Sequence, residues 1–193
     1  MPEYTSRQLQ AQKTKRKIYN AAVDLFDRRG FENTTIEDIS RKAGVSVGAF
    51  YHYYLSKSHI YSELFEKIDE FYKHTVAAQL DKENSYDNII FFFKQYAAYN
   101  SARGAEAVKQ LFNTENFQFL DKSRYMFELL VGLIRGGQEK NQLTKALTAD
   151  EIEELLLITA RGVVHDWMLH NGDYDMEAKM EDVLSKLRRV FTA

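Results

Sequence analysis

The fold follows from one stretch of the chain, TTIEDISRKAGVSVGAFYHYYLSK, which occupies residues 34–57. Its pattern predicts two short helices joined by a tight turn. Gly44 tolerates the positive φ at which a helix ends, and Ser46 is a good N-cap for a second helix. Phe50 and Tyr53 follow at helical spacing and share one face. This is the layout of a helix-turn-helix, whose second helix can enter the major groove of DNA.

The first helix of the pair has two candidate starts. Thr34 with Glu37, or Thr35 with Asp38, has the spacing of a reciprocal capping box, and spacing alone does not choose between them. The apolar residues that follow at steps of three and four predict one buried face, formed by Ile36, Ile39 and Ala43.

This stretch and its upstream flank resemble the DNA-binding domain of the TetR/AcrR family of bacterial transcriptional regulators. The resemblance covers roughly the first third of the chain. It rests on Thr34-Thr35-Ile36, Ala43-Gly44-Val45-Ser46, Gly48-Ala49-Phe50-Tyr51-His52-Tyr53-Tyr54, Ser56-Lys57, and upstream on Ile18, Ala21-Ala22, Leu25-Phe26 and Gly30-Phe31. Ser58 and His59 depart from the family, which commonly has acidic residues there, and this weakens the capping box expected for the next helix.

Composition favours a cytoplasmic protein that does not contact a membrane. The 193 residues include no cysteine, so a disulfide framework is excluded. The polar start of the chain lacks the apolar stretch of a signal peptide. Apolar runs such as 89–93 are far shorter than the roughly 20 residues that span a bilayer.

Charge is distributed unevenly along the chain. Residues 1–60 contain 10 Lys and Arg against 6 Asp and Glu, a net charge of +4. Residues 61–193 contain 16 against 22, a net charge of −6. A basic first segment suits a protein that places one end against phosphate, although the difference is modest.

The chain is predicted to be all-α. Its single proline is Pro2, and no strand-like alternation recurs. We expect a DNA-binding head of three helices at residues 1–55, whose first helix covers about 6–29. A linker helix from about Ser56 to about Leu80 should join it to a larger helical body for effector binding and dimerisation at residues 56–193.

Sequence-specific reading is expected from the start of the second short helix. Val47 offers methyl groups to a thymine methyl, Ser46 a flexible hydrogen bond, and Gly48 a close backbone approach. No Arg, Asn or Gln stands there, so DNA shape should supply part of the specificity. The resemblance further implies backbone contacts from Thr35, Tyr51, His52 and Lys57. Arg41 is a further candidate, and Lys13, Lys15, Arg16 and Lys17 form a basic tract on the first helix.

Two amphipathic helices at the C-terminus predict a dimer interface. In the family, the equivalent pair forms a four-helix bundle with the pair of a second subunit, whereas the alternative is that both complete the monomer core. Gly172 should end the first helix of the pair, and Asp173 or Asp175 should cap the second. The interface residues expected from the spacing are Leu155, Thr159, Gly162, Val163, Trp167, Met180, Leu184, Leu187 and Phe191.

The body is rich in aromatic residues, which predict an apolar core and, within it, a small-molecule site closed by a few polar groups. The candidate effector-binding residues are Phe92, Tyr96, Tyr99, Arg103, Phe112, Phe117, Tyr125, Met126 and His165. Aromatic walls favour a hydrophobic or flat effector. We expect no metal and no cofactor.

No catalytic cysteine, Gly-x-Ser-x-Gly elbow or phosphate loop is found, so an enzyme is not expected. The leading hypothesis is a homodimeric repressor, released from palindromic operator DNA by a small effector. An activator or an effector-independent regulator remains open. The alternative from another class is an all-α carrier or enzyme with a vestigial helix-turn-helix.

Overall fold

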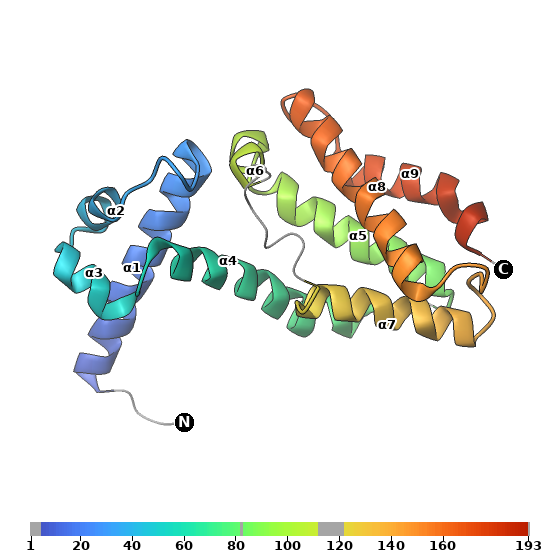
Figure 1. Cartoon of the computed structure of the whole chain (residues 1–193), viewed down its shortest axis with the longest axis horizontal. Coiled ribbons are helices and arrows are strands. Elements are labelled where there is room, and N and C mark those ends of the chain that lie inside the picture. The colour runs from blue at the N-terminus through green and yellow to red at the C-terminus, as the bar shows by residue number, and fades with distance from the viewer. Residues whose placement is uncertain (1–4, 82, 112–121, 193) are drawn as a thin grey trace. The chain divides into compact units, whose positions relative to one another are not determined.

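The computed structural model describes residues 5–81, 83–111 and 122–192 (Figure 1). The regular elements of these ranges are all helical, which confirms the predicted fold class, and Leu143 and Thr192 form an isolated antiparallel bridge. In chain order the elements are α1 (Ser6–Arg29), α2 (Ile36–Ala43), α3 (Val47–Tyr53), α4 (Lys57–Phe71), η1 (Tyr72–Val76), η2 (Ala77–Gln79), α5 (Ser85–Ser101), α6 (Ala105–Leu111), α7 (Tyr125–Glu139), α8 (Ala149–Leu169) and α9 (Met176–Phe191).

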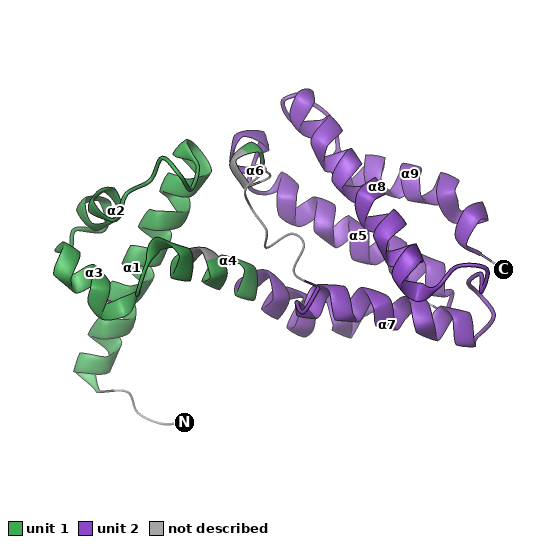
Figure 2. Cartoon of the chain, in the orientation of Figure 1, with its two compact units in different colours: residues 1–66, 109–118 green, residues 67–108, 119–193 purple. Residues whose placement is uncertain are grey.

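The chain forms two compact units (Figure 2). Unit 1 comprises residues 1–66 and 109–118, and unit 2 comprises residues 67–108 and 119–193. The division falls within α4, about three turns after the boundary expected from the sequence. None of the described helices combines the length and the apolar character that crossing a bilayer requires.

Unit 1 has one core, to which α1, α2, α3 and the start of α4 all contribute. Ile18, Ile39, Phe50 and Ile60 are each 0% exposed. The first helix, α1, has the predicted bounds and begins with a capping box between Thr5 and Gln8. The head is therefore held by contacts between helices that are individually short, since α2 and α3 have only eight and seven residues.

The linker helix extends as far as predicted but is not an α-helix throughout. Ser56 provides its N-terminal cap, because the Ser56 hydroxyl accepts a hydrogen bond from the amide of His59 at 3.2 Å. The α-helix ends at Phe71, and a π-helical turn and a 3₁₀ turn continue to Gln79. Such π turns are rare, and they often occur near functional sites.

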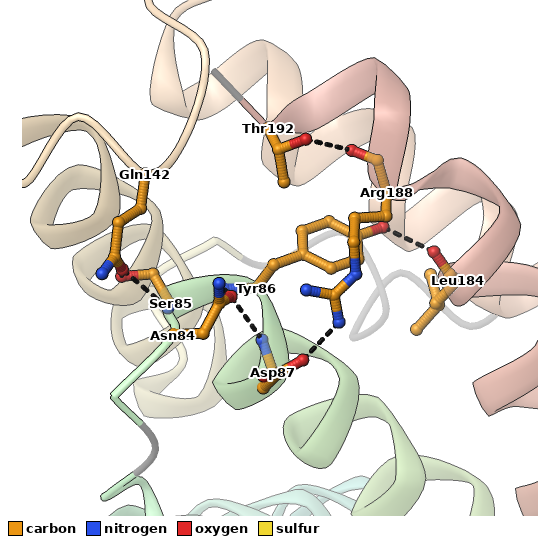
Figure 3. Close-up of polar contacts among 8 residues, drawn as sticks. All are labelled: Asn84, Ser85, Tyr86, Asp87, Gln142, Leu184, Arg188 and Thr192. Atoms are coloured by element: carbon orange, nitrogen blue, oxygen red, sulfur yellow. Dashed lines mark hydrogen bonds and ion pairs between the residues drawn. The ribbon is translucent and has the colours of Figure 1, made fainter.

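In unit 2, α5 packs against α9 and α7, and α8 packs against α7 and α9. The start of α5 is joined to α9 by polar contacts (Figure 3). Tyr86 donates its hydroxyl hydrogen to the carbonyl of Leu184 at 2.8 Å, and Arg188 pairs with Asp87 while lying 4.9 Å from the centre of the Tyr86 ring. Burial raises the pKa of Tyr86 to about 12, so this hydroxyl remains a donor at physiological pH.

The corner between α8 and α9 is built around Gly172 at φ 77°. The indole Nε1 of Trp167 donates to the carbonyl of Tyr174 at 2.9 Å, which places the ring beneath the turn. Asp175, rather than Asp173, caps α9 by accepting a hydrogen bond from the amide of Ala178 at 3.0 Å. The corner therefore requires both a left-handed backbone and a missing side chain at position 172.

Gly172→Ala is expected to destabilise the protein by about 2 kcal/mol, because an L-residue is strained at positive φ. A Cβ at this position would also lie 2.9 Å from Cζ2 of Trp167. Urea unfolding measures the change. Gly132→Ala is the control: it lies within α7 with no atom within 4 Å of its Cβ, so it should stabilise by about 0.5–1 kcal/mol. Wild-type stability for Gly172→Ala would contradict this account of the corner.

Candidate nucleic-acid interface

The start of α3 is exposed and rests on a buried support. Gly44 ends α2 in the left-handed conformation at φ 68°. Ser46 then caps α3, its hydroxyl oxygen accepting a hydrogen bond from the amide of Ala49 at 3.1 Å. Phe50, one turn further on, is fully buried. Phe50 thus anchors α3 in the core of unit 1, while the N-terminal amides of α3 face outward.

The residues predicted to read DNA lie together along α3. Ser46, Gly48, Tyr51 and His52 are exposed, and Val47 is half-buried. Tyr51 is 52% exposed, so its ring and its hydroxyl are accessible to a partner. The oxygen of Ser46 is used by the cap, but its hydroxyl hydrogen can still be donated to a base or a phosphate.

Thr35 caps α2 and Arg41 lies on it, and the structure chooses the later of the two candidate helix starts. Thr35 accepts from the amide of Asp38 at 3.1 Å and donates to its carboxylate at 2.9 Å, whereas Thr34 is buried and bonds to Gly30. The Thr35 hydroxyl and, less strongly, the Arg41 charge hold the pKa of Asp38 below its ordinary value. A phosphate contact by Thr35 must therefore come from its backbone.

The structure gives Lys57 contacts within unit 1 in addition to the phosphate contact that the family resemblance implies. Its Nζ donates to the carbonyls of Phe31 at 2.8 Å, Thr34 at 3.2 Å and Glu32 at 3.4 Å. Nζ also lies 4.3 Å from the centre of the Phe31 ring. An ammonium has three donors, and all three are directed at the loop before α2. Lys57 therefore ties the start of α4 to that loop, a contact that no sequence signal could indicate.

The basic tract of α1 is largely free to meet phosphate. Lys13, Arg16 and Lys17 are exposed, and each contact with phosphate steepens the salt dependence of binding. Lys15 is already paired with Glu63 of α4 at 3.1 Å. Exposed cations, exposed helix-start amides and a rigid α3 together form a surface suited to double-stranded DNA.

Residues 18–64 match the family model described as "Bacterial regulatory proteins, tetR family". This segment is therefore similar to the DNA-binding domain of that family of transcriptional regulators. It contains α2, α3 and most of the residues expected to contact DNA.

Similarity to transcriptional regulators extends over both units of the chain. The HTH-type transcriptional repressor KstR2 of Rhodococcus jostii is 26% identical over 179 residues, covering 88% of this chain and 86% of the relative. The fatty acid metabolism regulator protein of Bacillus subtilis is 22% identical over 178 residues, covering 89% and 92%. The solved structure of FadR from Bacillus subtilis in complex with stearoyl-CoA has a TM-score of 0.76 at 19% identity, covering 90% and 96%.

The candidate effector residues do not form one set. Phe92, Tyr96 and Met126 are buried in unit 2, and Tyr99, Arg103 and Tyr125 are half-buried there. Phe112 and Phe117 lie outside the described residues. His165 is exposed on α8, which makes it a poor member of a buried site. Burial raises the pKa of Tyr96 to about 12, so its hydroxyl is a neutral donor within the aromatic core.

A buried ion pair joins the last turn of α4 to the start of α7, and the sequence did not indicate it. Arg124 is 8% exposed, and its Nε and Nη2 lie 3.1 and 3.3 Å from the carboxylate of Asp69. Asp69 also accepts from the amide of Met126 at 3.2 Å. Tyr72, in the π turn that follows, is fully buried with its ring 4.7 Å from that of Phe92. The end of α4 is thus fixed to the aromatic core.

Five of the predicted interface residues belong to the core of the subunit itself. Each is at most 6% exposed, because α9 lies on α5 and α8: Val163, Trp167, Met180, Leu184 and Phe191. Their side chains have no surface left to offer a partner, so the interface prediction is corrected at these positions. The apolar spacing identified the buried face of each helix, which is turned inward.

An exposed apolar stripe on α8 remains available to a partner. Leu155, Ile158 and Leu169 are 43%, 59% and 68% exposed, and a Cβ on Gly162 would meet no atom within 4 Å. These positions follow the alternating steps of three and four of a helix-packing seam. Thr159 and Leu187 are half-buried, and Val190 on α9 is 55% exposed.

Proposed function

We propose that the protein is a homodimeric repressor that binds an inverted-repeat operator and is released by a small hydrophobic effector. DNA reading is assigned to residues 1–55, and effector binding and dimerisation to residues 56–193. The observation that carries the proposal is the exposed start of α3, capped by Ser46 and supported by the buried Phe50. Tyr51 and His52 are exposed on the same helix, so both side chains are accessible to DNA.

The exposed stripe of α8 supports the dimer. Leu155, Ile158 and Leu169 form a row of exposed apolar side chains, and Gly162 would let a second helix approach closely. A two-fold dimer presents two copies of α3, which suits half-sites about 34–36 Å apart. An operator bound in this way is an inverted repeat.

The aromatic core of unit 2 supports a hydrophobic effector. Tyr72, Phe92 and Phe93 are fully buried beside Tyr96, whose neutral hydroxyl can orient a polar group. Among the related proteins, the FadR of known structure was obtained with stearoyl-CoA. Long-chain acyl thioesters are therefore the first effector class to test.

Contacts at both ends of α4 support this helix as the route by which effector binding in unit 2 affects the DNA-binding unit. Lys57 holds its start to the loop before α2, and Asp69 holds its last turn to α7. An effector in the aromatic core of unit 2 would displace the end of α4, and the start of α4 would carry the movement to the loop at Phe31. Such an effector must prefer the conformation that does not bind DNA, since a ligand shifts a population only through differential affinity.

Enrichment of genomic fragments by the purified protein at about 150 mM salt tests DNA reading, because salt at this level suppresses much of the purely electrostatic binding. A few enriched sites that share an inverted repeat are expected. Adding acyl-CoA esters of increasing chain length should then lower the affinity for those sites. Enrichment that no effector changes would favour an effector-independent regulator, and the absence of sequence-specific enrichment would favour a carrier with a vestigial helix-turn-helix.

Val47→Ala is expected to reduce the difference in binding free energy between operator and random DNA by about 1 kcal/mol. The substitution removes methyl contact with a base and leaves the phosphate contacts in place. Fluorescence anisotropy with both DNAs measures this difference. Lys13→Ala is the matched control and should weaken both DNAs about equally. Equal losses for Val47→Ala on both DNAs would show that Val47 reads no base.

A further inference from the structure

Two cavities meet at one buried carboxylate between α7 and α8. The first has a volume of about 110 Å³ and the second about 240 Å³. Both are lined by Lys122, Phe127 and Glu153. Among the candidate effector residues that the structure describes, none lines either cavity.

Among the described residues, only one of the two carboxylate oxygens of Glu153 has a hydrogen-bond donor. Its side chain is 1% exposed, and its Oε2 lies 3.2 Å from Nζ of Lys122. Its Oε1 is buried without a hydrogen-bond donor in the part of the chain that the structure describes. Buried polar atoms in native proteins are nearly always bonded to protein or to water, so the unbonded oxygen of a carboxylate residue that lines two cavities indicates a missing donor.

The surroundings of Glu153 define the chemistry of that donor. The described lining of the smaller cavity has two positively charged side chains, Lys122 and Arg161, and two negatively charged ones, Glu153 and Glu154. An ammonium ligand would add a positive charge to a site that is already neutral, whereas a hydroxyl supplies a donor without a charge. Phe127, Leu157 and Ile158 provide apolar walls. We infer that this cavity binds a small neutral molecule with one hydroxyl donor on an apolar ring or short chain.

The size of the cavity limits the ligand to about one ring. Sites for drug-sized molecules usually have volumes of about 300–1,000 Å³. A volume of about 110 Å³ is well below that range. Phenol is therefore a suitable probe, and toluene is its control because it has the same shape without the O–H donor.

The test is a titration of the full-length protein with each probe, followed by the NMR signals of the Leu157 methyl groups. Phenol should bind about tenfold more tightly than toluene, the ratio that one added hydrogen bond to a carboxylate provides. Glu153→Met removes both carboxylate oxygens and supplies no strong donor or acceptor in their place, so the preference should fall to about one. Glu154→Gln, which changes the neighbouring carboxylate of the same cavity, should retain it.

Equal affinities for phenol and toluene in the wild-type protein would overturn the inference, as would tighter binding of benzylamine than of phenol. Unchanged methyl signals at millimolar phenol would also overturn it. The titration contains no DNA, so its failure leaves the proposed repressor untouched, and failure of the repressor proposal leaves this site untouched.

Discussion

Leu155→Glu is expected to turn the dimer into a monomer and to lower operator affinity by about a thousandfold, to the level of random DNA. Leu155 is 43% exposed in the isolated subunit, so a carboxylate there is solvated and the subunit still folds. In a dimer that buries the α8 stripe, the same carboxylate would lose its hydration without gaining an ionic partner. This desolvation would cost several kcal/mol of dimerisation free energy. A monomer presents one α3 to one half-site.

Light scattering measures the molar mass in solution, which distinguishes dimer from monomer. Fluorescence anisotropy with operator DNA measures the change in affinity. Leu9→Glu is the matched control, because Leu9 is 45% exposed on α1 of unit 1 and should leave the dimer intact. A charge at Leu184 cannot serve as a test, since this side chain is 0% exposed and its substitution would unfold unit 2. A Leu155→Glu protein that remains dimeric would place the interface elsewhere.

Lys57→Met is expected to destabilise unit 1 by about 3 kcal/mol, because three hydrogen bonds from a charged donor to carbonyls are lost while the aliphatic stem is kept. The loop at residues 31–34 precedes the Thr35 cap of α2, so its loosening should weaken binding to operator and random DNA alike. The slope of log affinity against log salt should not change, since no phosphate contact is removed. Urea unfolding and a salt series of anisotropy titrations measure the two effects.

Lys13→Met provides the contrast. Lys13 is exposed on α1, and if it contacts phosphate its loss should reduce the salt slope by a little under one unit with no change in stability. If Lys57→Met gives that same result, Lys57 contacts phosphate as the family resemblance implies, and its bonds to the loop are secondary.

The sequence was most informative where structure depends on neighbours in the chain. The bounds of α1, the left-handed turn at Gly44 and the cap at Ser46 were all predictable, because helix starts and ends depend on residues within about four positions. The choice between Thr34 and Thr35 was not, since both have capping spacing. Burial of Thr34 against the carbonyl of Gly30 leaves Thr35 as the cap.

The sequence by itself determined the helix-turn-helix, the all-helical class and the apolar face of each C-terminal helix. Only the tertiary structure decided what covers those faces: Met180 and Leu184 are buried within the subunit, whereas Leu155 and Ile158 remain exposed. It also directed Lys57 to carbonyls 23–26 residues away. Hydrophobic periodicity identifies the apolar face of a helix but not the element that packs against it. The contacts that bury such a face, or that pair a hydrogen-bond donor with its acceptor, join residues far apart in the chain.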